Sequence, residues 1–359
     1  MKINLYGPIC FTGYGVATTN ILKELVAQGH DISLWPIGGI TAQEENGPML
    51  EQCLKSGILA YDKHAPCIKI WHQHDLHFMV GKGEHIGFPI FELNKFRPEE
   101  LHCVANTDRL FVCSQWAKQI MEEQLSHSMV QDKPKVEVVP LGYDPMIFYP
   151  TDIPSGLSDY IFFNIGKWEI RKGHDILVKA FNDAFTPEDK VQLWMMPHNP
   201  FLNPQQKEEW ERMYKTSKLG EKIQIFDPCP THYHVAGLMR QSDCGVFPAR
   251  AEGWNLELLE MMACGKPCIA TNYSAHTEFT TKEDTFLIDI DKNESAYDGI
   301  WFHGQGEWAE LGQKQVDQLI EYMRFMYKNL PNGINGLTQA RKFTWKNSAK
   351  IISNLLNNT

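Results

Sequence analysis

Short apolar segments alternate with helix-like stretches along nearly the whole chain. Residues 3–6 have the pattern of a buried strand, and residues 16–27 carry apolar side chains at helical spacing before Gly29 ends that helix. A second strand pattern follows at residues 32–35. Strands that alternate with helices in this way predict a parallel, doubly wound α/β sheet, in which ligands bind beyond the carboxyl ends of the strands.

The alternation occurs in two series that are separated by a proline-rich segment. Residues 145–159 hold three prolines and little periodicity, and strand patterns resume after them. A chain of 359 residues is also too long for one small core. We therefore expect two Rossmann-like domains that face each other across a cleft, the first over residues 1–150 and the second over residues 158–342.

The composition limits the classes of partner that we expect for the chain and the cellular compartment in which we expect it. The 34 Lys and Arg residues against 44 Asp and Glu residues give a net charge of -10, and the first 150 residues are acidic as well. This balance gives no basic signal for nucleic acid or for an anionic membrane. No apolar run reaches the ~18 residues of a membrane span, and the amino terminus lacks a secretion signal. The nine cysteines form no C-x-x-C pair, so we expect buried free thiols and a cytoplasmic location.

A glycine turn follows the first strand, at Gly13-Tyr14-Gly15. Glycines let the backbone approach a ligand closely, and the free N–H groups at the start of the next helix favour an anion. A dinucleotide-binding fingerprint would need a third glycine near Thr18 and an acidic residue after the second strand, where Trp35 stands. The pattern therefore disfavours NAD and fits a phosphate or diphosphate. The alternative is an ordinary tight turn between strand and helix.

A cationic turn lies at the same kind of position in the second series. Residues 166–173, GKWEIRKG, carry Lys167, Arg171 and Lys172 between a strand and a helix. Three cations at the carboxyl end of a strand can hold a multiply charged anion and neutralise charge that grows on a leaving group. The alternative is a solvated basic loop.

Two glutamates flank the start of a predicted helix over residues 256–263. Glu252 falls in the loop before the helix, and Glu260 falls among the apolar residues Leu256, Leu259 and Met262. An unpaired carboxylate there would be costly, and a pair of ligand hydroxyls would satisfy it. The alternative is that Glu260 is exposed or bridged to a lysine.

Several histidines and aspartates are spaced as in some metal sites, but we expect no metal site here. His74 and Asp75 follow a predicted strand, and the spacing of the three histidines in residues 72–77 would permit metal ligation. Residues that contact a substrate, or histidines with a structural role, are the two other interpretations. Asp289 and Asp291 match a D-x-D pattern, but the residues that follow do not complete a calcium loop, so a solvated turn is expected.

Three tracts of the chain together resemble glycosyltransferase family 4, the retaining GT-B nucleotide-sugar glycosyltransferases of glycosyl transferases group 1. Residues 247–279, FPARAEGWNLELLEMMACGKPCIATNYSAHTEF, resemble the family's carboxy-lobe signature, and residues 166–181 resemble its phosphate-binding loop. Residues 139–150, VPLGYDPMIFYP, are similar to the end of its amino lobe. The resemblance implies the GT-B form of the α/β fold, with a last helix over about residues 345–359 that packs back on the first domain.

The resemblance also implies roles for individual residues. Glu252 would contact the donor sugar's hydroxyls, and Glu260 would bind the ribose hydroxyls. Lys172 would hold the diphosphate, and Gly13 and Gly15 would approach it from the opposite lobe. The backbone of the following four residues would lie along the sugar and the distal phosphate: Gly253, Trp254, Asn255 and Leu256. Trp254 is also the tryptophan that we single out as a candidate platform for carbohydrate.

Two positions depart from the family pattern. Lys167 stands where the family usually has an arginine, and Arg171 lies close enough in sequence to compensate, so which residue replaces that arginine stays open. The family often has a histidine after the strand predicted at residues 87–91, where this chain has Glu92. The residues expected to be catalytic are therefore Lys167, Lys172, Glu252 and Glu92.

The function implied is transfer of a hexose from a UDP- or GDP-linked sugar, for example UDP-glucose, to an acceptor hydroxyl with retention of configuration. Cations would stabilise the departing diphosphate, with no metal and no cofactor besides the donor. The acceptor is a glycan, a lipid-linked molecule or another hydroxyl compound. A nucleotide-sugar 2-epimerase-like isomerase and a non-catalytic nucleotide-sugar binding protein are the alternatives.

Overall fold

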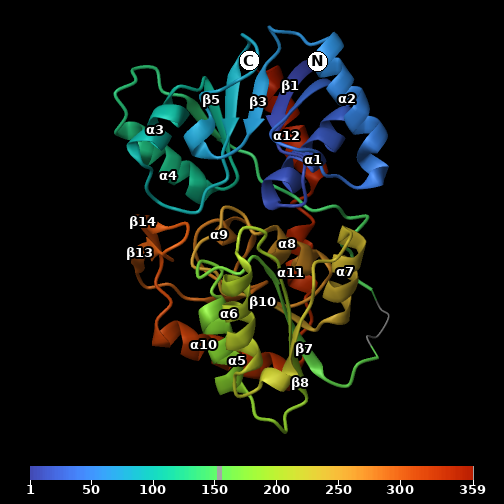
Figure 1. Ribbon diagram of the computed structural model, residues 1–359, viewed down its shortest axis with the longest axis vertical. Coiled ribbons are helices and arrows are strands. Elements are labelled where there is room, and N and C mark those ends of the chain that lie inside the picture. The colour runs from blue at the N-terminus through green and yellow to red at the C-terminus, as the bar shows by residue number, and fades with distance from the viewer. Residues whose placement is uncertain (152–155, 359) are drawn as a thin grey trace. The chain divides into compact units, whose positions relative to one another are not determined.

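The chain forms two compact units, seen in a computed structural model that describes residues 1–151 and 156–358 (Figure 1). Unit 1 comprises Met1–Gly142 and the chain from Phe343 onward, and unit 2 comprises Tyr143–Lys342. The chain thus leaves unit 1 at Gly142, before the boundary expected at residue 150. Ile147 already belongs to unit 2, where its carbonyl accepts a hydrogen bond from Arg240. The proline-rich segment predicted at 145–159 lies partly outside the described residues.

Unit 1 is built on a six-stranded parallel sheet of order β2-β1-β3-β4-β5-β6. Helices connect most successive strands, as the alternating pattern predicts, whereas β3 and β4 are joined by a loop with one short 3-10 turn. The strands and helices are β1 Lys2–Gly7, α1 Gly13–Ala27, β2 Asp31–Pro36, α2 Gly47–Leu59, β3 Cys67–Ile70, β4 His85–Phe88, α3 Pro98–Ala105, β5 Arg109–Val112, α4 Gln115–Ser126 and β6 Lys135–Val138.

A helix from the end of the chain completes unit 1. This helix, α12 (Trp345–Asn357), lies beside α1 (Figure 1). It is amphipathic, and its buried residues include Trp345, Ile352 and Leu356. The Ser348 hydroxyl donates to the Pro140 carbonyl oxygen over 2.6 Å. Apolar packing and a hydrogen bond to the end of the sheet therefore both hold α12 in unit 1.

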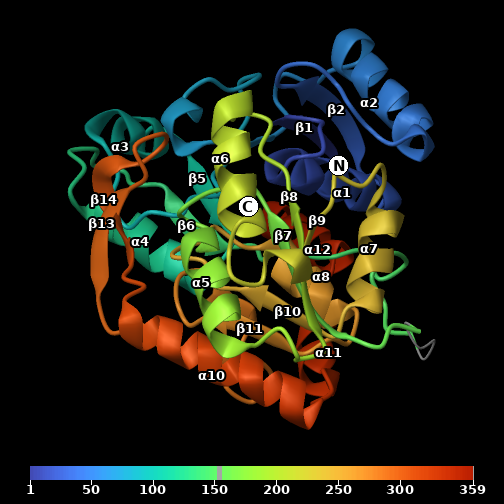
Figure 2. The same cartoon turned by 60° about the horizontal axis from the view of Figure 1, so that its bottom comes forward.

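Unit 2 repeats the architecture, with a parallel sheet of order β12-β11-β10-β7-β8-β9. Helices α5, α6 and α10 cover one face, and α7, α8 and α11 cover the other (Figure 1, Figure 2). The bounds are β7 Tyr160–Gly166, α5 His174–Ala184, β8 Val191–Pro197, α6 Pro204–Lys215, β9 Ile223–Ile225, α7 His232–Gln241, β10 Cys244–Phe247, α8 Leu256–Ala263, β11 Cys268–Thr271, α9 His276–Phe279, β12 Phe286–Ile288, α10 Gln313–Asn329 and α11 Ile334–Ala340. The two sheets confirm the predicted doubly wound α/β fold.

Unit 2 also contains a hairpin that was not predicted. An antiparallel hairpin, β13 (Asn293–Tyr297) and β14 (His303–Ala309), follows β12 on the side of α5 and α10 (Figure 2). It interrupts the regular alternation of parallel strands and helices.

The cysteines agree with the expectation from the sequence. All nine are free, and all except Cys10 and Cys229 are buried. Within the part of the chain that the structure describes, no helix combines the length and apolar character needed to cross a membrane.

Candidate active site

Glycines bracket the cationic loop between β7 and α5. Gly166 has φ 149° and Gly173 has φ 74°, both in the region that favours glycine. A Cβ atom on Gly173 would lie 1.9 Å from the carbonyl oxygen of Pro248. Only glycine therefore fits there, and the tight turn places Lys172 directly before the first turn of α5, where the helix dipole favours an anion.

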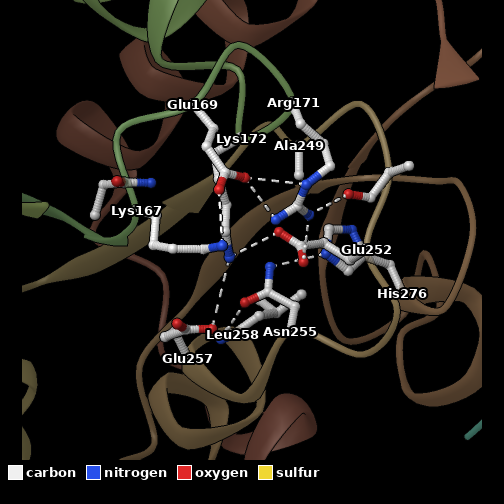
Figure 3. Close-up of polar contacts among 12 residues, drawn as sticks. Lys167, Glu169, Arg171, Lys172, Ala249, Glu252, Asn255, Glu257, Leu258 and His276 are labelled. Carbon is white, nitrogen blue, oxygen red and sulfur yellow. Dashed lines mark hydrogen bonds and ion pairs between the residues drawn. The ribbon is translucent and has the colours of Figure 1, made fainter. Parts of the chain in front are cut away.

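Glu252 is held by two buried cations of this loop (Figure 3). Its Oε1 lies 2.8 Å from Lys172 Nζ, and its Oε2 lies 2.9 Å from an Nη atom of Arg171. Burial opposes ionisation of Glu252, but Arg171 and Lys172 outweigh it and lower the pKa of Glu252 to about 2. Burial likewise opposes the charge on Lys172, and Glu252 with Glu257 nevertheless raises the pKa of Lys172. Glu252, Lys172 and Arg171 are therefore all charged at neutral pH.

Glu169, which sequence reasoning did not single out, ties the rest of the loop together. Its Oε1 lies 2.8 Å from Lys167 Nζ, and its Oε2 accepts from Nε and Nη2 of Arg171 over 3.1 and 2.8 Å. Arg171 also donates to the carbonyl oxygen of Ala251 over 2.7 Å. The Arg171 side chain is 4% exposed, whereas that of Lys167 is 39% exposed. Lys167 is thus the accessible cation, and Arg171 is enclosed by protein acceptors.

The loop that carries Glu252 is fixed by residues from the end of β11 and from α9. The N–H of Glu252 donates to Ser274 Oγ over 2.9 Å. Asn255 has φ 78°, and its side chain caps α8 by accepting from the N–H of Leu258. Its amide nitrogen lies 2.9 Å from Nε2 of His276, whose Nδ1 donates to the Thr271 carbonyl oxygen. Sequence spacing gave no signal for Ser274 or His276, because both come from a later segment.

His276 is neutral at this position. Burial lowers the pKa of His276 more than the nearby Glu252 raises it. A neutral ring with its hydrogen on Nδ1 leaves Nε2 free to accept from the Asn255 amide. These hydrogen bonds fix the side chain of Asn255, which caps α8 close to Glu252 in the chain.

Trp254 corrects one prediction. Its side chain is 2% exposed and packs on Phe279, with ring centroids 4.8 Å apart. Trp254 is therefore a core residue and cannot present its ring to a sugar. Gly253 lies in the same loop, and Leu256 is the first residue of α8. The contact of their backbone with the donor sugar and distal phosphate stays a prediction.

Glu260 fits the prediction of a carboxyl in need of a partner. It lies in α8 and is 8% exposed. No other residue that the structure describes forms a hydrogen bond or ion pair with its carboxyl group. Burial, and then the charge on Glu257, raises the pKa of Glu260 well above its usual value. Among the described residues, no lysine forms an ion pair with Glu260, so the alternative of a lysine bridge does not hold.

The remaining predicted residues belong to unit 1, and packing explains several of them. A Cβ atom on Gly15 would lie 2.3 Å from the carbonyl oxygen of Cys10, whereas one on Gly13 would meet nothing within 4 Å. Gly15 is thus required by the turn itself, which matches the alternative interpretation, and Gly13 is open. The Tyr14 hydroxyl donates to the Ile90 carbonyl oxygen over 2.6 Å and accepts from the Ile90 N–H over 3.0 Å, so Tyr14 holds the segment that leads to Glu92.

The histidine segment after β3 is organised by a buried lysine. Lys69 is 0% exposed, and its Nζ lies 3.0 Å from the Asp75 carboxylate and 2.8 Å from the Phe78 carbonyl oxygen. The rings of His72 and His74 stack at 5.4 Å. Asp75 thus has a structural partner that its predicted role as a substrate contact did not anticipate. Across residues 1–151 and 156–358, no three His, Cys, Asp or Glu side chains are grouped to hold a metal ion.

Known proteins resemble this chain in sequence and in fold. Residues 159–301 match the family model described as glycosyl transferases group 1. The D-inositol 3-phosphate glycosyltransferase of Segniliparus rotundus is 26% identical over 178 residues, 46% of this chain and 37% of the relative. The enzyme of the same name from Stackebrandtia nassauensis is 25% identical over 229 residues, 61% of this chain and 47% of the relative. The match therefore spans less than half the length of these relatives.

Solved structures share the fold across the whole chain. Sucrose-phosphate synthase from Thermosynechococcus elongatus has a TM-score of 0.71 at 15% identity, covering 99% of this chain and 98% of that one. Anabaena HepE, in complex with UDP and glucose, has a TM-score of 0.71 at 13% identity, covering 100% of both chains. These are GT-B structures, so the GT-B form of the fold is confirmed. The chain is therefore similar to glycosyl transferases group 1 over residues 159–301 in sequence and to GT-B structures over the whole chain in fold.

Proposed function

We propose that the protein is a retaining glycosyltransferase that moves a hexose from a UDP- or GDP-linked sugar to an acceptor hydroxyl without a metal ion. The match of residues 159–301 to the glycosyl transferases group 1 model supports the reaction class, and the likeness to a structure that holds UDP and glucose supports a nucleotide-sugar donor. The observation that carries the proposal is the buried group of Lys172, Arg171 and Glu252, with the unpaired carboxyl of Glu260 in the following helix.

The cations of the loop address the main energetic difficulty of the reaction. As the bond between the anomeric carbon and the diphosphate oxygen breaks, negative charge grows on the diphosphate. Lys167, directly after β7, and Lys172, just before α5, would stabilise that charge. The acceptor oxygen forms the new bond to the anomeric carbon on the same face, and its proton passes to the departing phosphate oxygen.

Glu252 would bind hydroxyl groups of the donor sugar rather than form a covalent intermediate. Its low pKa keeps it ionised, so it accepts hydrogen bonds from sugar hydroxyls. Arg171 has other acceptors and stays in place, which would keep Glu252 oriented while Lys172 turns to the diphosphate. Glu92 in unit 1 remains our candidate on the acceptor side.

A donor panel tests the proposal. UDP-glucose, UDP-galactose, UDP-N-acetylglucosamine and GDP-mannose are each incubated with the protein and an acceptor mixture in EDTA, and released nucleoside diphosphate is measured. Lys172→Ala should lower turnover by about 10²–10³. Lys179→Ala is the matched control on α5, because its side chain is 48% exposed and pairs only with Asp183 at the surface.

The outcomes separate the three functions. Release of nucleoside diphosphate that depends on acceptor and on Lys172 supports the transferase. Conversion of donor to an isomer without acceptor would favour the epimerase, and tight donor binding with neither transfer nor hydrolysis would favour a binding protein. Equal turnover in wild type and Lys172→Ala would show that the site is wrongly assigned.

A further inference from the structure

The geometry points to a sugar-binding platform beside the candidate active site, formed by Phe201 and the tip of the β13–β14 hairpin. We assign it to a glycan acceptor, and this assignment rests on the proposed function. The platform residues are Phe201, Tyr297, Ile300 and Trp301, all in unit 2.

The platform residues are large, apolar and exposed, and two of them, Phe201 and Trp301, are in contact. Phe201 is 60% exposed and Trp301 is 46% exposed, and their ring centroids lie 5.6 Å apart at an interplanar angle of 76°. Tyr297 and Ile300, in the same tip, are 64% and 41% exposed. Adjacent exposed apolar side chains of this size are typical of a binding surface.

The tip is rigid before any ligand arrives. The Oδ1 atom of Asp298 accepts hydrogen bonds from the N–H groups of Ile300, Trp301 and Phe302 over 2.8, 2.7 and 2.9 Å. Gly299 has φ 73°, which allows the tight turn. A surface that is already ordered loses little conformational entropy on binding. The hydrogen-bonded backbone of the tip should therefore keep the entropic cost of binding at these aromatic side chains small.

Arg250 fastens the hairpin to the phosphate loop. Its guanidinium lies 3.0 Å from Glu294 of β13 and 2.8 Å from Asp175 of α5, and it donates to the Ile170 carbonyl oxygen over 2.6 Å. Trp308 of β14 donates to the same Glu294 carboxylate over 3.1 Å. The hairpin is therefore fixed to the loop that carries Lys172.

Phe201 provides the link between the tip and the loop. The Asn199 amide donates to the Trp168 carbonyl oxygen over 3.1 Å, which holds the segment before Phe201 against the loop. Lys167 Nζ lies 5.9 Å from the centre of the Phe201 ring. The platform thus begins beside the accessible cation that we assign to the diphosphate.

This position suits an acceptor. In a transfer with retention through same-face attack, the acceptor hydroxyl must lie beside the departing phosphate, so the rest of the acceptor extends away from the diphosphate cations. A pyranose ring presents a face of C–H groups that stacks on an aromatic ring, while its hydroxyls stay at the rim. A fatty chain would set hydrocarbon beside the Lys167 ammonium and hinder its hydration. We therefore favour a glycan over a lipid tail.

The test measures binding directly and does not depend on turnover. Maltotriose, cellotriose and chitotriose, each at about 10 mM, are titrated by saturation-transfer NMR against wild type, Trp301→Ala and Phe201→Ala, with octyl β-D-glucoside as the lipid-tailed probe. At least one trisaccharide should bind, and each alanine variant should weaken that binding about tenfold. Trp301→Phe should retain most of the affinity. Tyr233→Ala, which removes an aromatic 49% exposed on α7, should have no effect.

UDP affinity, measured on every variant, separates the two proposals. If UDP binds the wild type and no trisaccharide does, or if the alanine variants bind trisaccharides as well as the wild type, the platform is wrong and the transferase proposal stands. Binding of octyl β-D-glucoside through its alkyl chain alone would replace the glycan with a lipid. Failure of UDP and of the other donors to bind the wild type would overturn the proposed function, and the acceptor role with it.

Discussion

Each cation of the loop between β7 and α5 is paired with a carboxylate of the chain itself. Lys167 pairs with Glu169, and Lys172 pairs with Glu252. Under the proposed function, a diphosphate would compete with Glu252 for the Lys172 ammonium group, and the sugar hydroxyls of the same donor would then satisfy Glu252. A complete donor would therefore offer Glu252 sugar hydroxyls in place of Lys172, whereas inorganic pyrophosphate would offer it no such partner.

Glu169 should affect ligand binding although its side chain is buried within the loop. Glu169→Gln removes the charge that holds Lys167 and Arg171, so we expect UDP affinity to fall about tenfold and the free energy of unfolding to fall by about 3 kcal/mol. Calorimetric titration and urea denaturation measure the two effects. Glu283→Gln, an exposed position, is the control. A loss of stability with unchanged UDP affinity would reduce Glu169 to a structural residue.

Glu260 should oppose stability while it supports donor binding. Its pKa is raised in the folded state, so the stability it contributes is complete below the unfolded value and is lost as pH rises towards the folded value. Glu260→Gln removes this loss, and we expect the free energy of unfolding at pH 7 to rise by about 1–3 kcal/mol. UDP binding should weaken, because an amide accepts fewer hydrogen bonds from the ribose hydroxyls.

Proton release provides the check on Glu260. If ribose hydroxyls bind the ionised carboxyl, UDP binding releases a proton, and calorimetry in buffers of different ionisation enthalpy detects it. UDP affinity of the wild type should increase as pH rises towards the raised pKa of Glu260, and Glu260→Gln should abolish this dependence. A pH-independent affinity in the wild type would contradict the assignment of Glu260 to the ribose.

Sequence reasoning singled out the cations of the candidate site and two of its carboxylates, but it missed Glu169 and did not predict how these groups pair. Lys172, Glu252 and Glu260 were predicted from residue type and position on a loop or helix, and those positions follow from local spacing. The burial of Trp254 depends on packing against Phe279 of α9, and the pairing of Asp75 with Lys69 depends on how the chain turns back after β3. Spacing along the chain carries no information about such contacts.

At the level of elements, the strands of both sheets could be predicted because each is a short apolar run between turns. The β13–β14 hairpin could not, because its segments NESAY and HGQGEWA are mostly polar and bury few side chains, among them Ala296 and Trp308. Its position depends on the ion pair between Arg250 and Glu294 rather than on an apolar pattern. Periodicity therefore gave no signal for the element that we propose to bind the acceptor.

Two glycine substitutions in unit 2 should have effects of opposite sign. Gly173→Ala introduces a Cβ at a positive φ and 1.9 Å from the Pro248 oxygen, so we expect a loss of at least about 2 kcal/mol in the free energy of unfolding. Gly237→Ala, within α7 and with nothing near its Cβ position, should gain about 0.5–1 kcal/mol. Urea denaturation of both variants measures the difference. Equal stabilities would contradict the geometry described for the start of α5.

At the scale of the whole molecule, the first and last segments of the chain share unit 1. Ile352 is buried where α12 covers α1. Ile352→Ala should lower the stability of unit 1 by about 2–4 kcal/mol, and hydrogen exchange should rise in residues 1–142 while it stays unchanged in residues 143–342. Lys350→Ala, exposed on the same helix, is the control. Faster exchange spread equally over both units would mean that they unfold together.

The placement of α12 also sets an order of assembly during translation. Every residue of unit 2 leaves the ribosome before α12 does, since Tyr143–Lys342 precede it in the chain. Domains generally fold as they emerge, so we expect unit 2 to finish first. The nascent amino-terminal sheet must meanwhile wait with one side of α1 uncovered, and this interval is when a chaperone would have most to protect.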